Sequence, residues 1–205
     1  MFPTSLTIIS GDNPEQRFWE WFQKNEESLY NFEKDQDKVF DKLSKEMNKV
    51  NSDLTFEFSP VKENGKREFV ISAGGIITAF PSVQALYATA PELKRWEFIK
   101  FRPRRVPINP INYANMSMDP ADVHYKMFED GEKVGIMLFL DGYNKDEHVT
   151  YATFGYLFLD EALGEYEIET KVSFIEFLGR DSEHFDDAQP LENLREAFDD
   201  YFGDQ

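Results

Sequence analysis

The densest group of side chains able to bind an anion lies between residues 94 and 105. Six basic residues stand there against one acid, Glu97. The six are Lys94, Arg95, Lys100, Arg102, Arg104 and Arg105. A guanidinium group presents a fork of N–H donors that fits a carboxylate or a phosphate. The segment therefore has two interpretations: an internal charge partnership with acids of the C-terminal third, or a site for an anionic ligand or partner.

As a site, the basic segment would act together with the proline-rich stretch that follows it and with a histidine beyond. Residues 103–120 contain four prolines and no periodicity, which predicts a long loop, and such loops are often functional. A deep pocket lined by arginines and a histidine would favour a small ligand, whereas a flat surface would favour a protein partner. The predicted binding residues are Lys100, Arg102, Arg104, Arg105 and His124.

The residue types give little support for a metal site, a cofactor site or a catalytic site. The chain has no cysteine, which excludes disulfides, thiolate zinc sites, iron–sulfur clusters and a cysteine nucleophile. The three histidines, His124, His148 and His184, share no metal-ligand spacing. No Gly-x-Ser-x-Gly elbow occurs. We therefore predict no metal, no cofactor and no catalytic residue, and favour a protein that is not an enzyme.

The charge of the chain is strongly negative and unevenly distributed. The formal net charge is -17. Residues 1–129 hold 19 acids and 17 bases, whereas residues 130–205 hold 20 acids and 5 bases. Nucleic acids need a cationic surface, so they are not expected as partners. The acidic excess either keeps the protein soluble or forms a surface for a basic protein partner.

Length and hydropathy indicate one cytoplasmic domain spanning residues 1–205. Hydrophobic residues make up 41% of the 205 positions, enough for a sizeable core. The segment Met1–Ser10 lacks the basic and apolar regions of a signal peptide. No stretch approaches the roughly 20 apolar residues that a membrane span needs. We therefore expect neither secretion nor a membrane partner.

Helical signals occur at both ends of the chain. Asn13 and Pro14 predict a helix start, and apolar residues then recur at helical spacing to residue 50, with interruptions at Asn25 and Gln36. Either one long helix or two shorter ones would fit residues 14–50. Pro190 predicts a last amphipathic helix over residues 190–202.

The middle of the chain shows one order of elements twice. Over residues 54–102, a hairpin with Asn64-Gly65 at its turn precedes a helix and a strand ending near Arg102. Over residues 122–177, a hairpin with Asp130-Gly131 precedes a helix ending at Gly164. Alternating polarity from Tyr166 to Phe177 then predicts a strand.

This order predicts the α+β class, with an antiparallel or mixed sheet made of two ββαβ halves, ferredoxin-like in spirit. Helices should cover one face of the sheet, because the strands alternate between apolar and polar residues. Six residues are predicted to be buried in the core: Phe56, Leu86, Phe98, Leu138, Phe158 and Phe174.

Five short segments in the first half carry a resemblance to a protein family. They are FWEWF at 18–22, LTFEF at 54–58, EFVISA at 68–73, APEL at 90–93 with Trp96, and FRPR at 101–104. They resemble an uncharacterised family of bacterial cytosolic proteins. The resemblance implies no assigned activity and no functional residue.

Two functional hypotheses follow from these patterns. The first is a non-enzymatic, acidic protein-interaction module, because the charge is polarised and no catalytic signature occurs. The alternative is an enzyme or small-ligand binder that holds an anionic group with residues 94–105.

Overall fold

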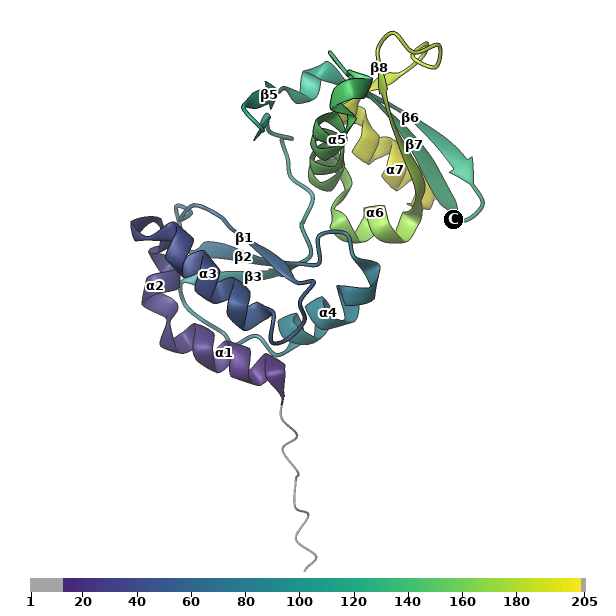
Figure 1. Ribbon diagram of the computed structural model, residues 1–205. Coiled ribbons are helices and arrows are strands. Elements are labelled where there is room, and N and C mark those ends of the chain that lie inside the picture. The colour runs from purple at the N-terminus through teal and green to yellow at the C-terminus, as the bar shows by residue number, and fades with distance from the viewer. Residues whose placement is uncertain (1–12, 204–205) are drawn as a thin grey trace, which may run out of the picture. The chain divides into compact units, whose positions relative to one another are not determined.

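The computed structural model describes residues 13–203, and the chain divides into two compact units, Met1–Lys100 (unit 1) and Phe101–Gln205 (unit 2). Figure 1 shows both units and their elements. The sequence favours one domain, but the strands of the two units belong to separate sheets. The α+β class is confirmed, whereas a single sheet shared by both halves is not what the structure shows. The segment Met1–Ser10 lies outside the described residues.

The N-terminal helical region of unit 1 is broken rather than continuous. Its helices are α1 (Pro14–Lys24), α2 (Glu26–Tyr30) and α3 (Gln36–Met47), with a 3-10 helix at Phe32–Lys34. The Asn13 side chain caps α1 by accepting hydrogen bonds from the backbone N–H groups of Glu15 and Gln16. At the other end, the Asn25 side chain donates to the Trp21 carbonyl at 2.8 Å and stops the helix.

Unit 1 contains a three-stranded sheet in the order β1-β2-β3. The strands are β1 (Thr55–Phe58), β2 (Arg67–Ser72) and β3 (Trp96–Lys100), and α4 (Phe80–Ala88) connects β2 to β3. β1 and β2 are antiparallel neighbours, as predicted, and β3 runs parallel to β2. The prediction of a two-residue turn at Asn64-Gly65 was wrong. Pro60 lies just after β1 and has no N–H with which to extend the ladder, so an eight-residue loop (59–66) connects the two strands. Within this loop Gly65 has a positive φ and Asn64 does not.

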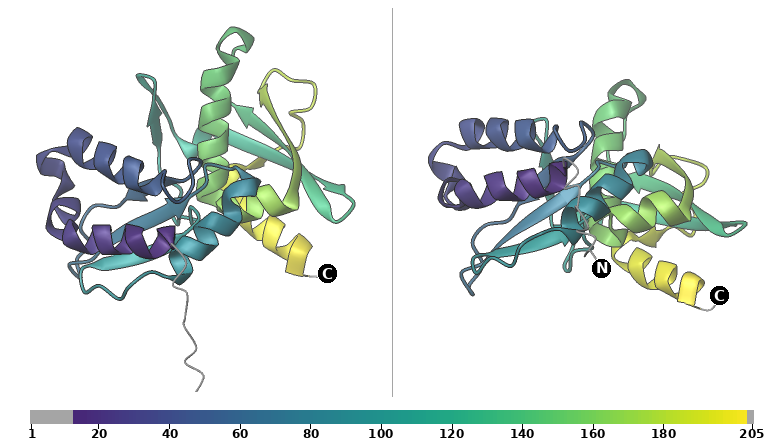
Figure 2. Two further views of the ribbon diagram at one scale, coloured as in Figure 1. Left: turned by 60° about the horizontal axis from the view of Figure 1, so that its bottom comes forward. Right: turned by 90° about the horizontal axis from the view of Figure 1, so that it is seen from below.

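Aromatic side chains hold unit 1 together. Phe22 of α1 stacks on Phe69 of β2 with ring centroids 5.3 Å apart, and the Trp19 and Phe98 rings pack edge to face with centroids 4.7 Å apart. Trp19 also donates from Nε1 to the Leu86 carbonyl at 2.8 Å, linking α1 to α4. Figures 1 and 2 show α1 and α3 side by side. Of the predicted core residues here, Leu86 is buried, while Phe98 and Phe56 are only half-buried.

Unit 2 contains a four-stranded sheet in the order β8-β7-β6-β9, together with a small two-stranded sheet. Its strands are β4 (Ile111–Tyr113), β5 (Met116–Met118), β6 (Val123–Asp130), β7 (Lys133–Leu140), β8 (Val172–Gly179) and β9 (Gln189–Pro190). Its helices are α5 (His148–Leu163), α6 (Glu165–Lys171) and α7 (Leu194–Gly203), with 3-10 helices at Pro120–Asp122, Lys145–Glu147 and Leu191–Asn193.

The proline-rich stretch is not a structureless loop. β4 and β5 form a hairpin within it, and both turn residues, Ala114 and Asn115, have positive φ values of 49° and 63°. Two left-handed residues in succession are typical of a type I′ turn. This hairpin was not predicted, because alanine, unlike glycine, does not indicate a positive φ.

The predicted hairpin of β6 and β7 is confirmed, with its turn shifted by one residue. Asp130 pairs with Lys133, so the two-residue turn is Gly131-Glu132, and Gly131 has a φ of 65°. The helix that follows is also confirmed. Asn144 accepts from the backbone of Asp146 just before it, and Gly164 ends it with a φ of 83°.

The strand predicted from Tyr166 to Phe177 was partly wrong, because its first half is the helix α6. The Glu165 backbone N–H donates to the Arg102 carbonyl, and the Thr170 hydroxyl donates to the Tyr166 carbonyl one helical turn earlier. Between Glu165 and Lys171, only Ile168 and the N-terminal Glu165 are buried. So few buried positions are compatible with a short surface helix as well as with a strand. The strand begins at Val172.

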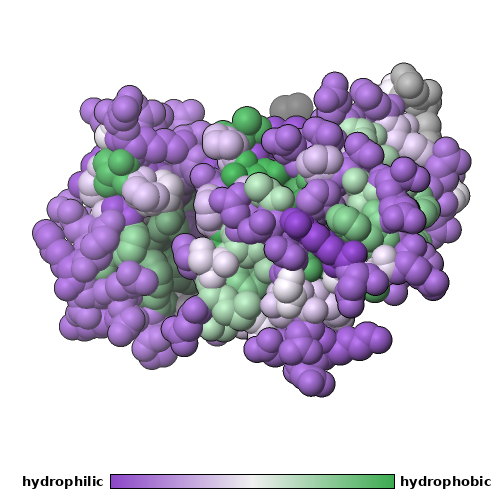
Figure 3. Space-filling model, turned by 90° about the horizontal axis from the view of Figure 1, so that it is seen from above, coloured by the Kyte–Doolittle hydropathy of each residue, from purple (hydrophilic) through white to green (hydrophobic). Residues whose placement is uncertain are grey.

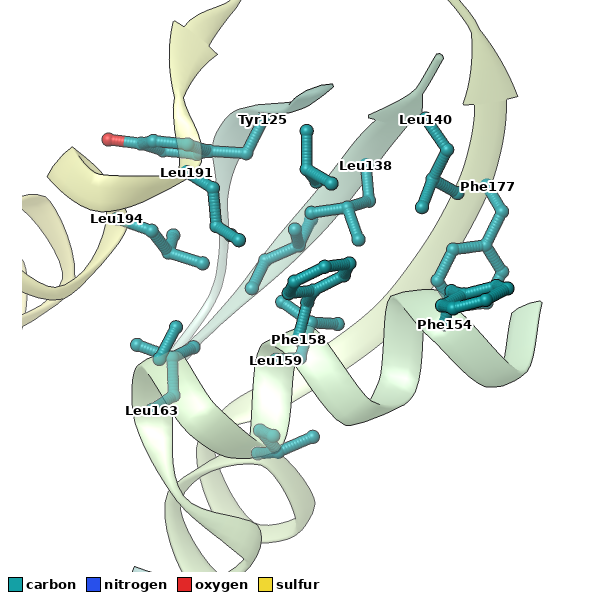
Figure 4. Packing of buried hydrophobic residues seen from close by; sticks show 14 of the residues in the cluster. Tyr125, Leu138, Leu140, Phe154, Phe158, Leu159, Leu163, Phe177, Leu191 and Leu194 are labelled. Atoms are coloured by element: carbon teal, nitrogen blue, oxygen red, sulfur yellow. The ribbon is translucent and has the colours of Figure 1, made fainter. Parts of the chain in front are cut away.

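The core of unit 2 lies between α5 and the inner face of its sheet (Figure 4). Leu138 and Phe158 are fully buried there, as predicted. Phe174 is 44% exposed, so its prediction was wrong. A β-bulge between Val134 and Gly135 shifts the register, and the Phe174 ring covers Gly135, where a Cβ would lie 2.0 Å from it. Beyond the bulge, Ile175 and Phe177 are the residues of β8 that pack on the core.

Candidate functional site

The first residues of unit 2 are fixed against the C-terminal end of α5. The backbone N–H of Arg105 donates to the Glu161 carbonyl at 2.8 Å. Arg102 and Glu165 exchange two hydrogen bonds: the Arg102 N–H donates to the Glu165 carboxylate, and the Glu165 N–H donates to the Arg102 carbonyl, each at 3.0 Å. The basic segment is therefore part of the corner between α5 and α6.

Arg102 and Arg104 serve this corner rather than an open site. Arg104 donates from Nε to the Leu163 carbonyl at 2.8 Å and from Nη1 to both carboxylate oxygens of Asp199 at 2.7 and 2.8 Å. Arg102 Nη1 lies 3.1 Å from Asp160 Oδ2. A cation at a helix C-terminus also interacts favourably with the unpaired carbonyls of the last turn. For these two arginines the structure bears out the internal charge partnership with the C-terminal third.

Three basic residues of the segment, Lys94, Arg95 and Lys100, belong to unit 1. Arg95 binds Glu26 at 3.2 Å and Glu27 at 2.9 Å. The hydrogen bond between Arg95 and Glu27 raises the pKa of Arg95 and lowers the pKa of Glu27. Lys100 is exposed, with its Nζ 5.8 Å from the ring centroid of Tyr87. The six basic residues therefore do not form one site.

Replacing Arg104 by alanine should destabilise the protein, because the change removes the donor to the Leu163 carbonyl. We expect the free energy of unfolding in urea to fall by about 1 to 2 kcal/mol, most of it from the carbonyl bond, since Asp199 is half exposed. The matched control is Lys100→Ala, for which a loss below about 0.5 kcal/mol is expected. Equal losses in the two variants would contradict the capping role of Arg104.

Two predicted site residues, Arg105 and His124, do meet in one cavity of unit 2. The cavity has a volume of about 620 Å³. Its wall also contains Arg195, at the start of α7, which is not among the predicted binding residues. The other lining residues are Val106, Pro107, Ile108, Asp119, Pro120, Ala121, Ala162, Pro190 and Glu192. Apolar side chains and prolines thus form most of the wall, and charged groups interrupt it at a few points.

Local structure explains how distant segments line this cavity. Asp119 caps the 3-10 helix Pro120–Asp122 by accepting from the Ala121 N–H at 2.9 Å. The chain then enters β6, where His124 lies opposite Pro190 of β9. Because proline has no N–H for a further ladder bond, β9 stops there and the chain turns into the 3-10 helix Leu191–Asn193 and α7.

Arg195 and Glu192 are opposite charges that do not pair with each other. They lie three residues apart, a spacing at which helical side chains commonly form ion pairs. Within residues 13–203, neither side chain makes a hydrogen bond or an ion pair. Asp199, four residues after Arg195, pairs with Arg104 instead. A cation and an anion are therefore both available at this cavity.

His124, one of the residues that line the cavity, carries an uncharged imidazole. Burial lowers its pKa, and the nearby charge of Arg180 lowers it further, against a smaller opposing effect of Asp122 and Asp141. The Nδ1 atom is buried and has no hydrogen-bond partner among the described residues. The ring packs against the edge of Phe185, with centroids 5.5 Å apart. Near pH 7 His124 is therefore neutral and adds no charge to the cavity.

The predicted binding residues coincide with the cavity only in part. Arg105 and His124 were predicted and lie in it, whereas Lys100, Arg102 and Arg104 were predicted and do not. Arg195, Glu192 and Asp119 were missed. The spacing of Glu192 and Arg195 looks in the sequence like an ordinary surface ion pair, so it carried no signal of a site.

Fold and cavity together define a two-unit α+β protein with a pocket of small-molecule size in its second unit. No three His, Asp or Glu residues gather in the described part of the chain in a way that could hold a metal ion. Among the same residues, no helix is long and apolar enough to cross a membrane. Comparisons with protein-family models, with curated proteins and with solved structures found no match. The resemblance of the first half to a bacterial family therefore stays a prediction.

Proposed function

We propose that unit 2 binds a small organic molecule through an anionic group, in the cavity lined by Arg105 and Arg195. The observation that carries the proposal is the cavity itself. Its volume of about 620 Å³ falls within the range of roughly 300 to 1,000 Å³ that is common for ligand sites. Such sites are mostly apolar with a few polar groups for orientation, as this wall is.

Arg195 is the residue best suited to hold the anionic group. It is half-buried in a unit that carries 23 of the 39 acids of the chain, yet none of the described acids pairs with it. Arg102 and Arg104, by contrast, are committed to Asp160 and Asp199. A guanidinium can bind a carboxylate in a bidentate manner, which fixes the orientation of the ligand as well as its position. The proposed role of the cavity is to bind the ligand, without any chemical step.

A panel of organic acids should reveal binding as a rise in the thermal midpoint of the full-length protein. A ligand that binds only the native state stabilises it by about 2.7 kcal/mol when present at about 100 times its Kd. We expect benzoate and indole acetate to raise the midpoint more than inorganic phosphate or sulfate does. The Arg195→Gln variant should lose this response, and Glu196→Gln, one residue further along α7, should keep it. No response to any organic acid in the parent protein would contradict the proposal.

A second candidate function rests on the exposed acids of unit 2. Residues 101–205 hold 23 acids and 9 bases, and hydrophilic residues cover most of the face in Figure 3. Acids are exposed at the β6–β7 turn and in the loop after β8: Glu129, Asp130, Glu132, Asp181, Glu183, Asp186 and Asp187. We propose on this ground that the protein is a cytoplasmic interaction module for a basic protein, with no role for nucleic acid or membrane. Arg195→Gln should not affect such a partner.

We also propose that the two units are related in fold. In unit 1, β1 and β2 are antiparallel and β3 is parallel to β2 after α4. In unit 2, β6 and β7 are antiparallel and β8 is parallel to β7 after α5 and α6. This shared order supports two related ββαβ halves, ferredoxin-like in their sequence of elements.

A further inference from the structure

We infer that the ligand of the unit 2 cavity is a zwitterion: a molecule with one carboxylate, one ammonium group and an apolar body, of which a free apolar amino acid is the simplest case. This inference rests on the proposed function and names the ligand class of the same site. Three features of the cavity support it: the balance of its charges, the position of its unpaired pair, and the apolar wall behind them.

The charges on the wall are balanced. Arg105 and Arg195 supply two cations, Asp119 and Glu192 supply two anions, and His124 is neutral near pH 7. A phosphate ester or a dicarboxylate would bring two negative charges close to two carboxylates, and like charges at short range repel one another. A ligand with no net charge avoids this repulsion, provided that it can still interact with both signs.

The unpaired groups show where each end of such a ligand would bind. Glu192, in the 3-10 helix Leu191–Asn193, and Arg195, in the first turn of α7, line the same cavity, yet neither has a partner among residues 13–203. Charged groups held near a low-polarity wall are stabilised by an opposite charge. A carboxylate on Arg195 and an ammonium group on Glu192 would satisfy both side chains at once.

The rest of the wall suits the apolar body. Ala162 of α5 is buried at 1% exposure, and Ile108 packs against the hydrophobic core. Arg195 is half-buried and Glu192 is exposed. The charged groups of the ligand would therefore lie on the α7 side, and its apolar side chain would extend toward Ile108 and Ala162. The cavity volume of about 620 Å³ leaves room for an aromatic side chain.

Calorimetric titration of the full-length protein with three related probes tests the inference. Phenylalanine carries both charges, N-acetylphenylalanine lacks the ammonium group, and phenethylamine lacks the carboxylate. We expect phenylalanine to bind at least about ten-fold more tightly than either of the others, a difference of about 1.4 kcal/mol. Leucine should also bind, because the apolar wall offers no group that requires an aromatic ring.

Two variants and one control identify the groups involved. Glu192→Gln should raise the Kd for phenylalanine about ten-fold and leave the Kd for N-acetylphenylalanine unchanged, since that probe has no ammonium group to lose. Arg195→Gln should weaken both probes. Glu196→Gln, on an exposed residue of α7 outside the cavity, should change neither.

The outcomes distinguish the zwitterion inference from the proposed function. If N-acetylphenylalanine binds as tightly as phenylalanine, and Glu192→Gln has no effect on either, the ligand is a simple organic acid. The zwitterion inference is then overturned, while the proposed function stands. If no carboxylate binds the parent protein, both are overturned.

Discussion

Replacing Phe158 by alanine should lower the free energy of unfolding by about 3 to 5 kcal/mol, the largest effect expected of any single change in this protein. Phe158 is fully buried, and its ring faces the inner side of the sheet near Leu138 (Figure 4). The substitution removes a whole aromatic ring from a packed core and leaves a cavity that rigid neighbours on α5 and β7 fill only in part.

Urea unfolding followed by far-ultraviolet circular dichroism would measure this loss. Tryptophan fluorescence is a poor substitute, because Trp19, Trp21 and Trp96 all belong to unit 1. The matched control is Val149→Ala on the same helix, where a side chain that is 77% exposed should cost less than about 0.5 kcal/mol. A loss below about 1 kcal/mol for Phe158→Ala would show that the core of unit 2 is not organised around this residue.

Replacing Gly164 by alanine should cost about 2 to 3 kcal/mol, because two separate constraints require glycine there. Its φ of 83° and ψ of 147° lie in a region that only glycine adopts readily. A Cβ at this position would also lie 3.2 Å from the Arg102 carbonyl oxygen, within the corner that fixes the basic segment.

Gly131→Ala is the control for these two constraints. Gly131 also has a positive φ, 65°, but a Cβ there would have no atom within 4 Å. We expect Gly131→Ala to cost about 1 kcal/mol from backbone strain alone. The excess loss in Gly164→Ala then measures the close approach of the Arg102 carbonyl together with the less favourable backbone region of Gly164. If the two variants lose the same stability, neither of these constraints adds to the cost at Gly164.

Local signals in the sequence were sufficient for most of the elements. Asn13 before Pro14 placed the first helix, and Asn144 and Gly164 placed the start and end of α5. These signals work because a cap or a positive φ is satisfied by residues within one turn of the chain. The β6–β7 hairpin was found for the same reason, whereas β1 and β2 are joined by an eight-residue loop rather than by the predicted turn at Asn64-Gly65.

Local signals failed where distant residues decide the outcome. The stretch from Glu165 to Lys171 alternates like a strand, but the Arg102 carbonyl, 63 residues earlier than Glu165, accepts the first N–H of a helix. Phe174 looks like a core residue, but a bulge opposite Val134 turns it outward over Gly135. Neither the position of the Arg102 carbonyl nor the bulge can be predicted from the neighbouring sequence.

The candidate site divides in the same way. The sequence by itself determined that residues 94–105 are rich in cations and that the C-terminal third is rich in anions, because composition needs no folding. Only the tertiary structure decided which of these charges neutralise each other. Arg102 and Arg104 reach Asp160 and Asp199, while Arg105 and Arg195 line a cavity, because charges interact through distance in space and not through separation along the chain.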